Sequence, residues 1–257
     1  MYRSRRNYFI LSCLAAFLCS GCVTIYNPAT QKKETLLIDT ASEVALGADM
    51  DLEIQRKLKI VTDPQRQYRL AGIGDRVASS SDRQDLVYRF KIIKDDELNA
   101  FAIPGGFIYV NSGLMDAATD DELAGVLAHE IGHIACRHSV KKLQADLGYQ
   151  LIMGIVFGLS GQNTMGRAMD IVFGLTSLGY SRKDEFLADK LAVRYAKRAG
   201  FNPYGIVTFF EKLKAEAQNK GPDFNLVFLS SHPPIAERIK NVQLEIDNVS
   251  GLPSSLP

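Results

Sequence analysis

Apolar residues recur at helical spacing along much of the chain, beginning near residue 40. Thr40 and Glu43 have the three-residue spacing of a capping box. The apolar positions that follow repeat every four residues, at Leu46, Met50, Ile54 and Leu58. This pattern predicts a helix that runs to about residue 60.

A second helix is predicted to begin at Asp63-Pro64 and to end near the serines at 79–81, because Asp is a favoured N-cap and Pro is tolerated in the first turn. The run Gly72-Ile73-Gly74 lies inside this helix. It is only half of a dinucleotide-binding fingerprint and follows no strand, so we assign it to helix packing.

Extended segments follow. Apolar and charged residues alternate over 86–94, which predicts a half-buried strand. Residues 99–103 and 107–110 form two more extended stretches, and the turn residues Pro104-Gly105-Gly106 join them. The three segments predict one small sheet.

Helical patterns return after the sheet. Thr119 and Glu122 form a second capping box, which opens a helix predicted to reach about residue 146. Further helices are predicted over 183–198, from Asn202-Pro203 to about residue 219, and from the segment 231–234 to about residue 246. Many helices beside one small sheet predict a single, mainly helical α+β domain.

Two apolar, Gly-rich runs lie between these helices, at 149–160 and 171–179. Each is shorter than the roughly 20 residues that a membrane span needs. They are either buried core helices or a mobile lid or membrane-touching hairpin.

The N-terminal segment has a different character. Arg3, Arg5 and Arg6 precede an apolar run over 8–18, and Cys19-Ser20-Gly21-Cys22 follows. A basic start, a short apolar region and a small-residue site are typical of a secretory signal. The residues before Cys22 resemble a bacterial lipobox, in which that cysteine is lipidated, although Cys19 stands where Leu is usual. A plain cleaved signal and a retained anchor are the alternatives.

Composition narrows the classes of function. The 257 residues are 46% apolar and 23% charged, which excludes a disordered chain. A formal net charge of +1 provides no basic surplus for nucleic acid, so no nucleic-acid partner is expected. If Cys13 and Cys19 leave with the signal and Cys22 is lipidated, Cys136 alone remains and no intramolecular disulfide is expected.

The chemistry-bearing motif is His129-Glu130-Ile131-Gly132-His133, within the helix predicted from Thr119. Histidines four residues apart lie on one helix face, so both imidazoles can reach one metal ion. Glu130 borders that face and can exchange a proton with a water on the metal. The spacing therefore predicts metal-assisted hydrolysis.

A catalytic metal site of this kind takes a third protein ligand and keeps one position open. Glu185 begins a separate predicted helix, and Asp189 follows one turn later on the same face. A carboxylate so placed can accept the free N–H of a metal-bound histidine. Acidic pairs at this spacing more often lie on a solvated helix surface. Only the upstream histidine motif favours a role for this pair in a metal site.

The two motifs together resemble the gluzincin peptidases of the HtpX and CAAX-prenyl-protease family. Two further blocks match in the family's order, namely 99–106 and Ser231-His232-Pro233-Pro234 with Arg238. The chain is most similar to the soluble, exported branch typified by LoiP and BepA, because it lacks the long hydrophobic spans of membrane members. The short segment after the last predicted helix favours a compact, LoiP-like protein over one with BepA's C-terminal repeat domain.

The resemblance implies a zincin-type fold with a small edge-strand sheet beside the HExxH helix. It implies one Zn²⁺ per chain, bound by His129, His133 and Glu185, and Glu130 as the general base that activates a zinc-bound water against the scissile carbonyl. Asp189 is implied to support a ligand histidine, and Arg238 to lie near the centre or in a structural ion pair. The implied substrate-binding edge strand comprises Asn99, Ala100, Phe101, Ala102 and Ile103.

The two remaining histidines, His232 and His138, have different expected roles. His232 either stabilises the substrate oxyanion or occupies the fourth zinc position and holds the enzyme latent, and the resemblance favours latency. A helix-start histidine without a metal role is the third possibility. His138 lies about 140° around the predicted helix from His133, so it is expected to be structural. Cys136 is expected to be packing.

These inferences divide the chain into a lipoprotein-type signal peptide (1–21), a tether (22–39), a zinc metallopeptidase domain (40–247) and a disordered tail (248–257). The expected function is endopeptidase cleavage of unfolded or misassembled envelope proteins, as quality control. Val23 is not the Asp that retains lipoproteins in the inner membrane, which favours an outer-membrane lipoprotein facing the periplasm over a soluble periplasmic protein. A latent, chaperone-like binding protein and a metal aminopeptidase are the alternatives, and the oligomeric state is not predicted.

Overall fold

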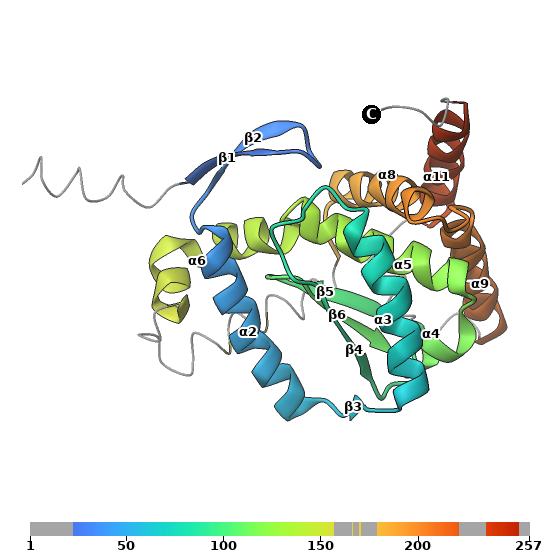
Figure 1. The fold of residues 1–257 in the computed structure, drawn as a ribbon, viewed down its shortest axis with the longest axis horizontal. Coiled ribbons are helices and arrows are strands. Elements are labelled where there is room, and N and C mark those ends of the chain that lie inside the picture. Colours follow the sequence, from blue (N-terminus) through green and yellow to red (C-terminus); the bar gives the residue numbers. More distant parts are fainter. Residues whose placement is uncertain (1–22, 157–165, 167–169, 171–178, 221–234, 252–257) are drawn as a thin grey trace, which may run out of the picture.

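Helix α5 (Asp120–Ala135) lies at the centre of the fold in the computed structural model, which describes residues 23–156, 166, 170, 179–220 and 235–251 (Figure 1). Every residue from Glu122 to Ala135 is buried. A helix buried on all sides has to be apolar nearly all round, which explains the Leu, Ala, Val and Ile content of this segment. The capping box of Thr119 and Glu122 is present as predicted.

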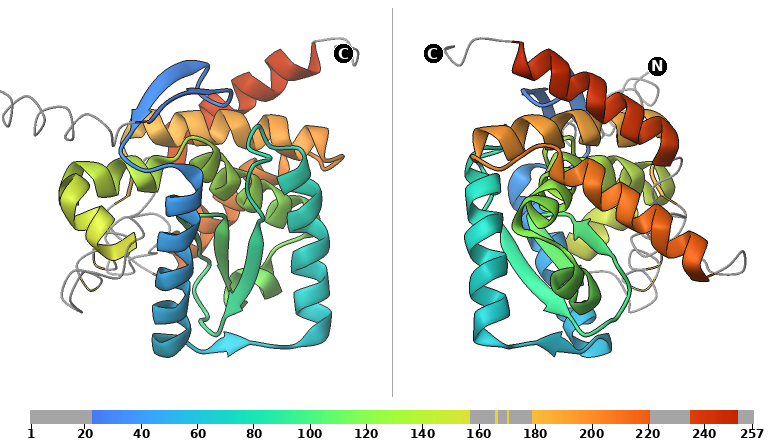
Figure 2. Two further views of the ribbon diagram at one scale, coloured as in Figure 1. Left: turned by 60° about the vertical axis from the view of Figure 1, so that its left-hand side comes forward. Right: turned by 90° about the vertical axis from the view of Figure 1, so that its right-hand side faces the viewer.

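The other helices surround α5 and the sheet. They are α2 (Thr40–Lys57), α3 (Pro64–Ser79), α4 (Ser112–Ala117), α6 (His138–Val156), α8 (Arg182–Arg198), α9 (Gly205–Lys220) and α11 (Ile235–Ser250). Helices α3, α8 and α9 pack directly on α5, and α11 packs on α8 and α9 (Figure 2). The prediction of a mainly helical α+β fold is confirmed.

The main sheet has the strand order β3-β4-β6-β5, and β5 forms one edge. Its strands are β3 (Ile60–Val61), β4 (Arg89–Ile93), β5 (Ala100–Ile103) and β6 (Phe107–Asn111). Strands β5 and β6 are antiparallel, and the turn between them uses Gly105 and Gly106 at φ of 81° and 92°, where glycine avoids a Cβ clash. Strands β4 and β6 run parallel.

Both faces of this sheet are covered, and successive side chains alternate between two clusters. Phe101, Ile103 and Tyr109 pack with apolar residues of α2 and α6. Ala100, Ala102, Ile108 and Val110 pack instead with residues of α3 and α5. The small alanines of β5 face α5, which allows the edge strand to lie close to the helix that carries the histidine motif.

Residues 23–36, which lie in the segment predicted to be a tether, are folded instead. They form a two-stranded antiparallel sheet of β1 (Val23–Asn27) and β2 (Lys32–Leu36). The hairpin is attached to the body, because Asn27 Nδ2 donates to the carbonyl of Ala135 at the end of α5, at 3.0 Å. Leu36 and Ile38 are buried. The polar composition of this segment concealed a strand pair whose outer face is solvated.

The predicted capping box at Thr40 and Glu43 is wrong, although the helix itself is confirmed. Asp39 is the N-cap, and its side chain accepts from the backbone N–H of Ser42. Glu43 is 1% exposed and pairs with Arg83 and Arg137 instead. A buried carboxylate facing two guanidinium groups gains more from those ion pairs than from a helix N–H.

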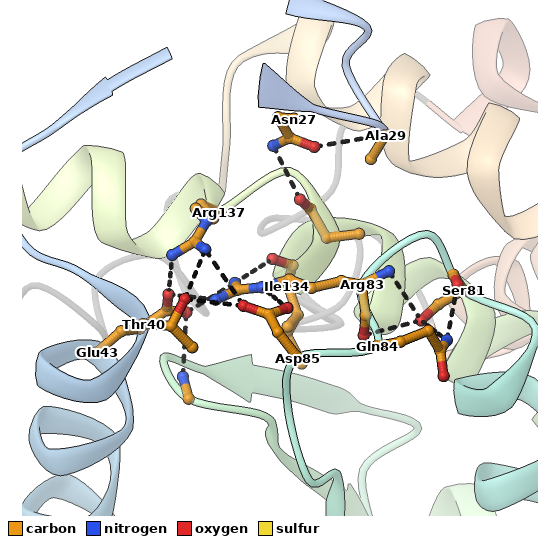
Figure 3. A network of polar contacts seen from close by, with 12 residues as sticks. Asn27, Ala29, Thr40, Glu43, Ser81, Arg83, Gln84, Asp85, Ile134 and Arg137 are labelled. Carbon is orange, nitrogen blue, oxygen red and sulfur yellow. Dashed lines mark hydrogen bonds and ion pairs between the residues drawn. The ribbon is translucent and has the colours of Figure 1, made fainter. Parts of the chain in front are cut away.

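The helix predicted to reach residue 146 is interrupted. Helix α5 ends at Ala135, Arg137 adopts a φ of 55°, and α6 begins at His138. The Arg137 side chain is held by Glu43 and by Thr40 Oγ1 on α2 (Figure 3). These contacts compensate for a backbone conformation that a non-glycine residue seldom adopts.

The same Glu43 carboxylate joins four parts of the chain. It accepts from Arg83 Nη1 at 2.9 Å and Nη2 at 2.6 Å, from Arg137, and from the backbone N–H of Gly105 at 3.2 Å (Figure 3). Helix α2, the segment before β4, the α5–α6 break and the turn after β5 therefore meet at one buried group.

Several expectations concern segments only partly described. No helix among the described residues is both long and apolar enough to cross a membrane. Helix α6 carries the first apolar run as far as Val156, while most of 157–178 lies outside the described residues, so the choice between core and lid is not tested. Helix α11 extends to Ser250, beyond the predicted start of the tail at 248.

Gly47 provides a test of how α2 meets the edge strand. A Cβ at Gly47 would lie 2.0 Å from the carbonyl oxygen of Pro104, directly after β5, whereas a Cβ at Gly72 in α3 would meet nothing within 4 Å. We expect Gly47→Ala to lower the free energy of unfolding by about 1–3 kcal/mol through overpacking. The control Gly72→Ala should raise it by up to about 1 kcal/mol, because alanine favours the helix.

Urea denaturation of both variants and the wild type measures the difference. Equal effects of the two substitutions would show that α2 does not pack closely on the turn after β5.

Candidate metal centre

The three predicted metal ligands converge at one point. His129 and His133 come from successive turns of α5, and Glu185 comes from the first turn of α8. His129 Nε2 lies 3.0 Å from His133 Nε2, and the Glu185 carboxylate oxygens lie 3.6 Å and 3.5 Å from these two nitrogens. All three side chains are buried, and their ligand atoms lie within 4.8 Å of one another.

This arrangement fits zinc. Two ligands at about 2.1 Å from a tetrahedral zinc ion are about 3.4 Å apart, and the observed spacings of 3.0–3.6 Å lie around that value. Two imidazoles and one carboxylate form a donor set typical of catalytic zinc, which leaves a fourth position for water or substrate. Among the described residues, the buried site therefore has the three ligands and the spacing that the ion requires.

Glu130 lies beside the ligands and is 2% exposed. Burial raises its pKa well above the usual value, and the nearby Glu185 carboxylate raises it further. Its Oε1 atom has no hydrogen-bond partner among the described residues, while the backbone of Ala102 in β5 forms a hydrogen bond with this carboxyl group. Glu130 thus has one oxygen available to a reacting group and is held close to the edge strand.

Asp189 of α8 contacts His129 of α5. Its Oδ1 lies 3.0 Å from His129 Nδ1, the ring nitrogen that faces away from His133 and Glu185. Burial alone would raise the pKa of Asp189, but Arg238 and the hydrogen bonds from Arg238 and His129 lower it to about 2. Asp189 is therefore an anion that can orient the His129 ring.

Arg238 combines the two roles that the resemblance left open. It is 0% exposed, its Nη1 lies 3.2 Å from Glu185, and its Nη2 lies 2.6 Å from Asp189. The guanidinium group also lies 4.4 Å from the centre of the Phe210 ring. Helix α11 thus supplies one cation to two carboxylates of α8, one of which is a candidate ligand.

His138 does not lie where the prediction placed it. Because α5 ends before it, the angle around a continuous helix no longer applies. Its Nδ1 lies 2.9 Å from His133 Nδ1, and its Nε2 lies 3.3 Å from Asp184 Oδ1. Burial lowers the pKa of His138 to about 4.

Tyr180 belongs to the site but was missed in the sequence. Its ring stacks on His133 with the ring centres 4.1 Å apart and the planes 26° from parallel. Burial raises its pKa, and the carboxylates of Glu130 and Glu185 add to that shift. The only available signal was its position five residues before Glu185, which does not distinguish it from other loop tyrosines.

Of the remaining site residues predicted from the sequence, some lie among the described residues and others do not. Asn99 and all residues of β5 are buried at the sheet edge beside α5, and Asn99 Oδ1 has no hydrogen-bond partner among the described residues. Cys136 is buried, and burial raises its pKa to about 12, as suits a packing residue. His232 and Cys22 lie outside the described residues, so their predicted roles are not tested.

Comparison with known proteins points to one family. Residues 64–246 match the profile of peptidase family M48. The chain is 33% identical to the metalloprotease YcaL over 60% of each protein, and 33% identical to the metalloprotease LoiP over 68% of each. It is 23% identical to the beta-barrel assembly-enhancing protease over 95% of this chain and 53% of that protein. All three relatives are from Escherichia coli (strain K12), and the chain spans about half to two thirds of their lengths.

The buried ion pairs between α8 and α11 lead to a prediction. Arg238→Met would leave two buried carboxylates without their cation, so we expect the free energy of unfolding to fall by about 3–5 kcal/mol. The control is Arg194→Met, which removes an ion pair with Glu245 between the same two helices, at 2.9 Å and with the arginine 35% exposed. This loss should be below about 1 kcal/mol.

Chemical denaturation of the metal-free proteins measures both losses. A loss for Arg238→Met as small as that for Arg194→Met would contradict the coupling of α11 to the centre.

Proposed function

The chain belongs to peptidase family M48 and carries that family's zinc metalloendopeptidase domain, and we propose that it cleaves protein chains at the centre formed by His129, His133 and Glu185, with Glu130 as general base. The observation that carries the proposal is the convergence of these three buried ligands beside a buried acid. Zinc, when bound, supplies a Lewis acid that polarises the scissile carbonyl and acidifies water.

Glu130 performs the proton transfers in this proposal. Its buried carboxyl group, next to the ligand His129 in the chain, takes a proton from the attacking water and returns it to the leaving amine. The Oε1 atom without a partner among the described residues is the position from which it would do so. The hydrogen bond with the backbone of Ala102 holds the carboxyl group in place during both steps.

Strand β5 is the proposed substrate platform. It is the edge strand of the sheet and pairs only with β6 among the described strands. An extended peptide that adds to this edge places its backbone next to Ala102, and therefore next to Glu130. The register of the substrate and the position of the base are thus set by the same residue. The proposal extends the platform to Asn99, Ala100, Phe101 and Ile103.

Asp189 and Arg238 act through the ligands. Asp189 fixes the tautomer and direction of His129, and Arg238 keeps Asp189 ionised and pairs with Glu185 in a buried setting. Neither residue contacts the substrate in this proposal. They keep the three ligands in a geometry that suits a four-coordinate ion.

The proposed location is the bacterial envelope, with unfolded or misassembled envelope proteins as substrates. The secretory signal and Cys22 support lipid attachment to the outer membrane, on the side facing the periplasm. The name of one relative, the beta-barrel assembly-enhancing protease, supports substrates of this class. Strand β1 begins directly after Cys22, so a lipid there would hold the domain close to the membrane.

The mechanism is tested by Glu130→Gln. We expect this variant to retain zinc, because the three ligands are unchanged, and to lose about 10²–10⁴-fold in rate, because it has no general base. Glu185→Ala is the contrasting variant and should lose the metal as well as the activity. Zinc content by mass spectrometry and cleavage of a labelled unfolded protein are measured on the same preparations.

Full activity in Glu130→Gln would reject the proposed mechanism. A wild-type protein that binds zinc and unfolded protein without cleaving it would favour the latent, chaperone-like alternative.

Attachment is tested by Cys22→Ser. We expect this variant to move from the membrane fraction to the soluble periplasmic fraction, because stable anchoring by lipid depends on the acyl chains at that residue. Cys13→Ser provides the control, since that residue is proposed to leave with the signal peptide. Unchanged membrane association of Cys22→Ser would show that another part of the chain holds the protein there.

A further inference from the structure

The two candidate ligand histidines each direct their second ring nitrogen at a separate partner. For His129 this partner is Asp189, at 3.0 Å from Nδ1. For His133 it is another histidine, since His138 Nδ1 lies 2.9 Å from His133 Nδ1. We propose that His138 is a positioning residue, which accepts the Nδ1–H of His133 and so orients the His133 ring toward zinc. This inference rests on the proposed zinc centre.

The direction of the hydrogen bond follows from the chemistry of the ring. A histidine that binds a metal through Nε2 carries its proton on Nδ1. His138 Nδ1 must then be the acceptor, so the proton of His138 lies on Nε2. That nitrogen faces Asp184 Oδ1 at 3.3 Å. Each N–H in the series His133, His138, Asp184 therefore meets an acceptor, whereas the opposite tautomer of His138 would place two N–H groups face to face.

Burial makes this partner difficult to replace with water. The His133 and His138 side chains are 1% and 4% exposed, whereas Asp184 is 38% exposed and connects the series to solvent. Tyr180 stacks on His133 and lies 5.8 Å from His138 between ring centres. With one face of the ring covered and Nδ1 hydrogen-bonded, His133 has little freedom to rotate away from the metal.

The break between α5 and α6 makes the contact possible. On a continuous helix a residue five positions after His133 would point about 140° away from it. The left-handed turn at Arg137 instead redirects the chain, and α6 begins at His138. The Glu43 ion pairs that hold Arg137 therefore also support the placement of His138.

Two amide substitutions in the full chain separate the acceptor role from packing. The side-chain oxygen of Asn lies near the position of His Nδ1, while that of Gln reaches toward the position of Nε2. We expect His138→Asn to keep a zinc affinity close to wild type. His138→Gln should weaken the affinity by about 10–100-fold, as the loss of a hydrogen-bond partner of a metal ligand does. Competition with a chromophoric chelator measures the zinc Kd at fixed pH, and the absorption of the cobalt-substituted protein reports the ligand geometry.

Cys136→Ala is the control, because it alters a buried side chain at the same helix break and leaves the nitrogen contacts of both histidines in place. Thermal melts of the metal-free variants establish that each is folded. Wild-type affinity in His138→Gln would overturn the proposal, as would a folded His138→Asn that binds zinc as weakly as His138→Gln. If His138→Gln does not fold, the affinity of His138→Asn alone decides. A wild type that binds no zinc would instead reject the proposed function.

Discussion

Charged groups that are removed from water have to be paired, and this constraint organises the centre of the molecule. Glu185 and Asp189 on α8 and Arg238 on α11 are each no more than 1% exposed. A single unpaired charge in such a place would cost several kcal/mol. The docking of α11 on α8 is therefore coupled to the pairing of Arg238 with the two carboxylates, one of which is a proposed zinc ligand. Fold stability and ligand presentation depend on the same three side chains.

A second buried carboxylate has the same kind of effect at the C-terminal end of the motif helix. The Glu43 carboxylate accepts hydrogen bonds from Arg83, Arg137 and the backbone N–H of Gly105. It therefore connects α2, the α5–α6 break and the turn after the edge strand. The end of the helix that carries the histidines and the turn after the strand proposed to bind substrate are thus joined through one carboxylate. Between this helix and this strand, the small side chains of Ala100 and Ala102 allow close approach.

Local signals in the sequence were sufficient for most of the elements. The four-residue apolar repeat of α2, the Asp-Pro start of α3, the capping box at Thr119 and the glycine turn before β6 were all predictable, because each depends on neighbours within a few residues. Predictions failed where a distant residue competed with a local one. Glu43 was expected to cap its own helix but is taken by Arg83 and Arg137, and the hairpin at 23–36 is held in part by Asn27 on the carbonyl of Ala135.

The sequence by itself determined the histidine motif, since two histidines four residues apart share one helix face, with Glu130 at its border, in any fold that keeps the helix. Helical spacing could not determine which other side chains contact the candidate ligands. Arg238 and Tyr180 reach the centre from separate segments, and His138 does so only because the helix breaks before it, at Arg137. Such contacts depend on how helices pack and where they break. Packing is decided by the whole buried interior, whereas spacing along one helix is decided by backbone geometry alone.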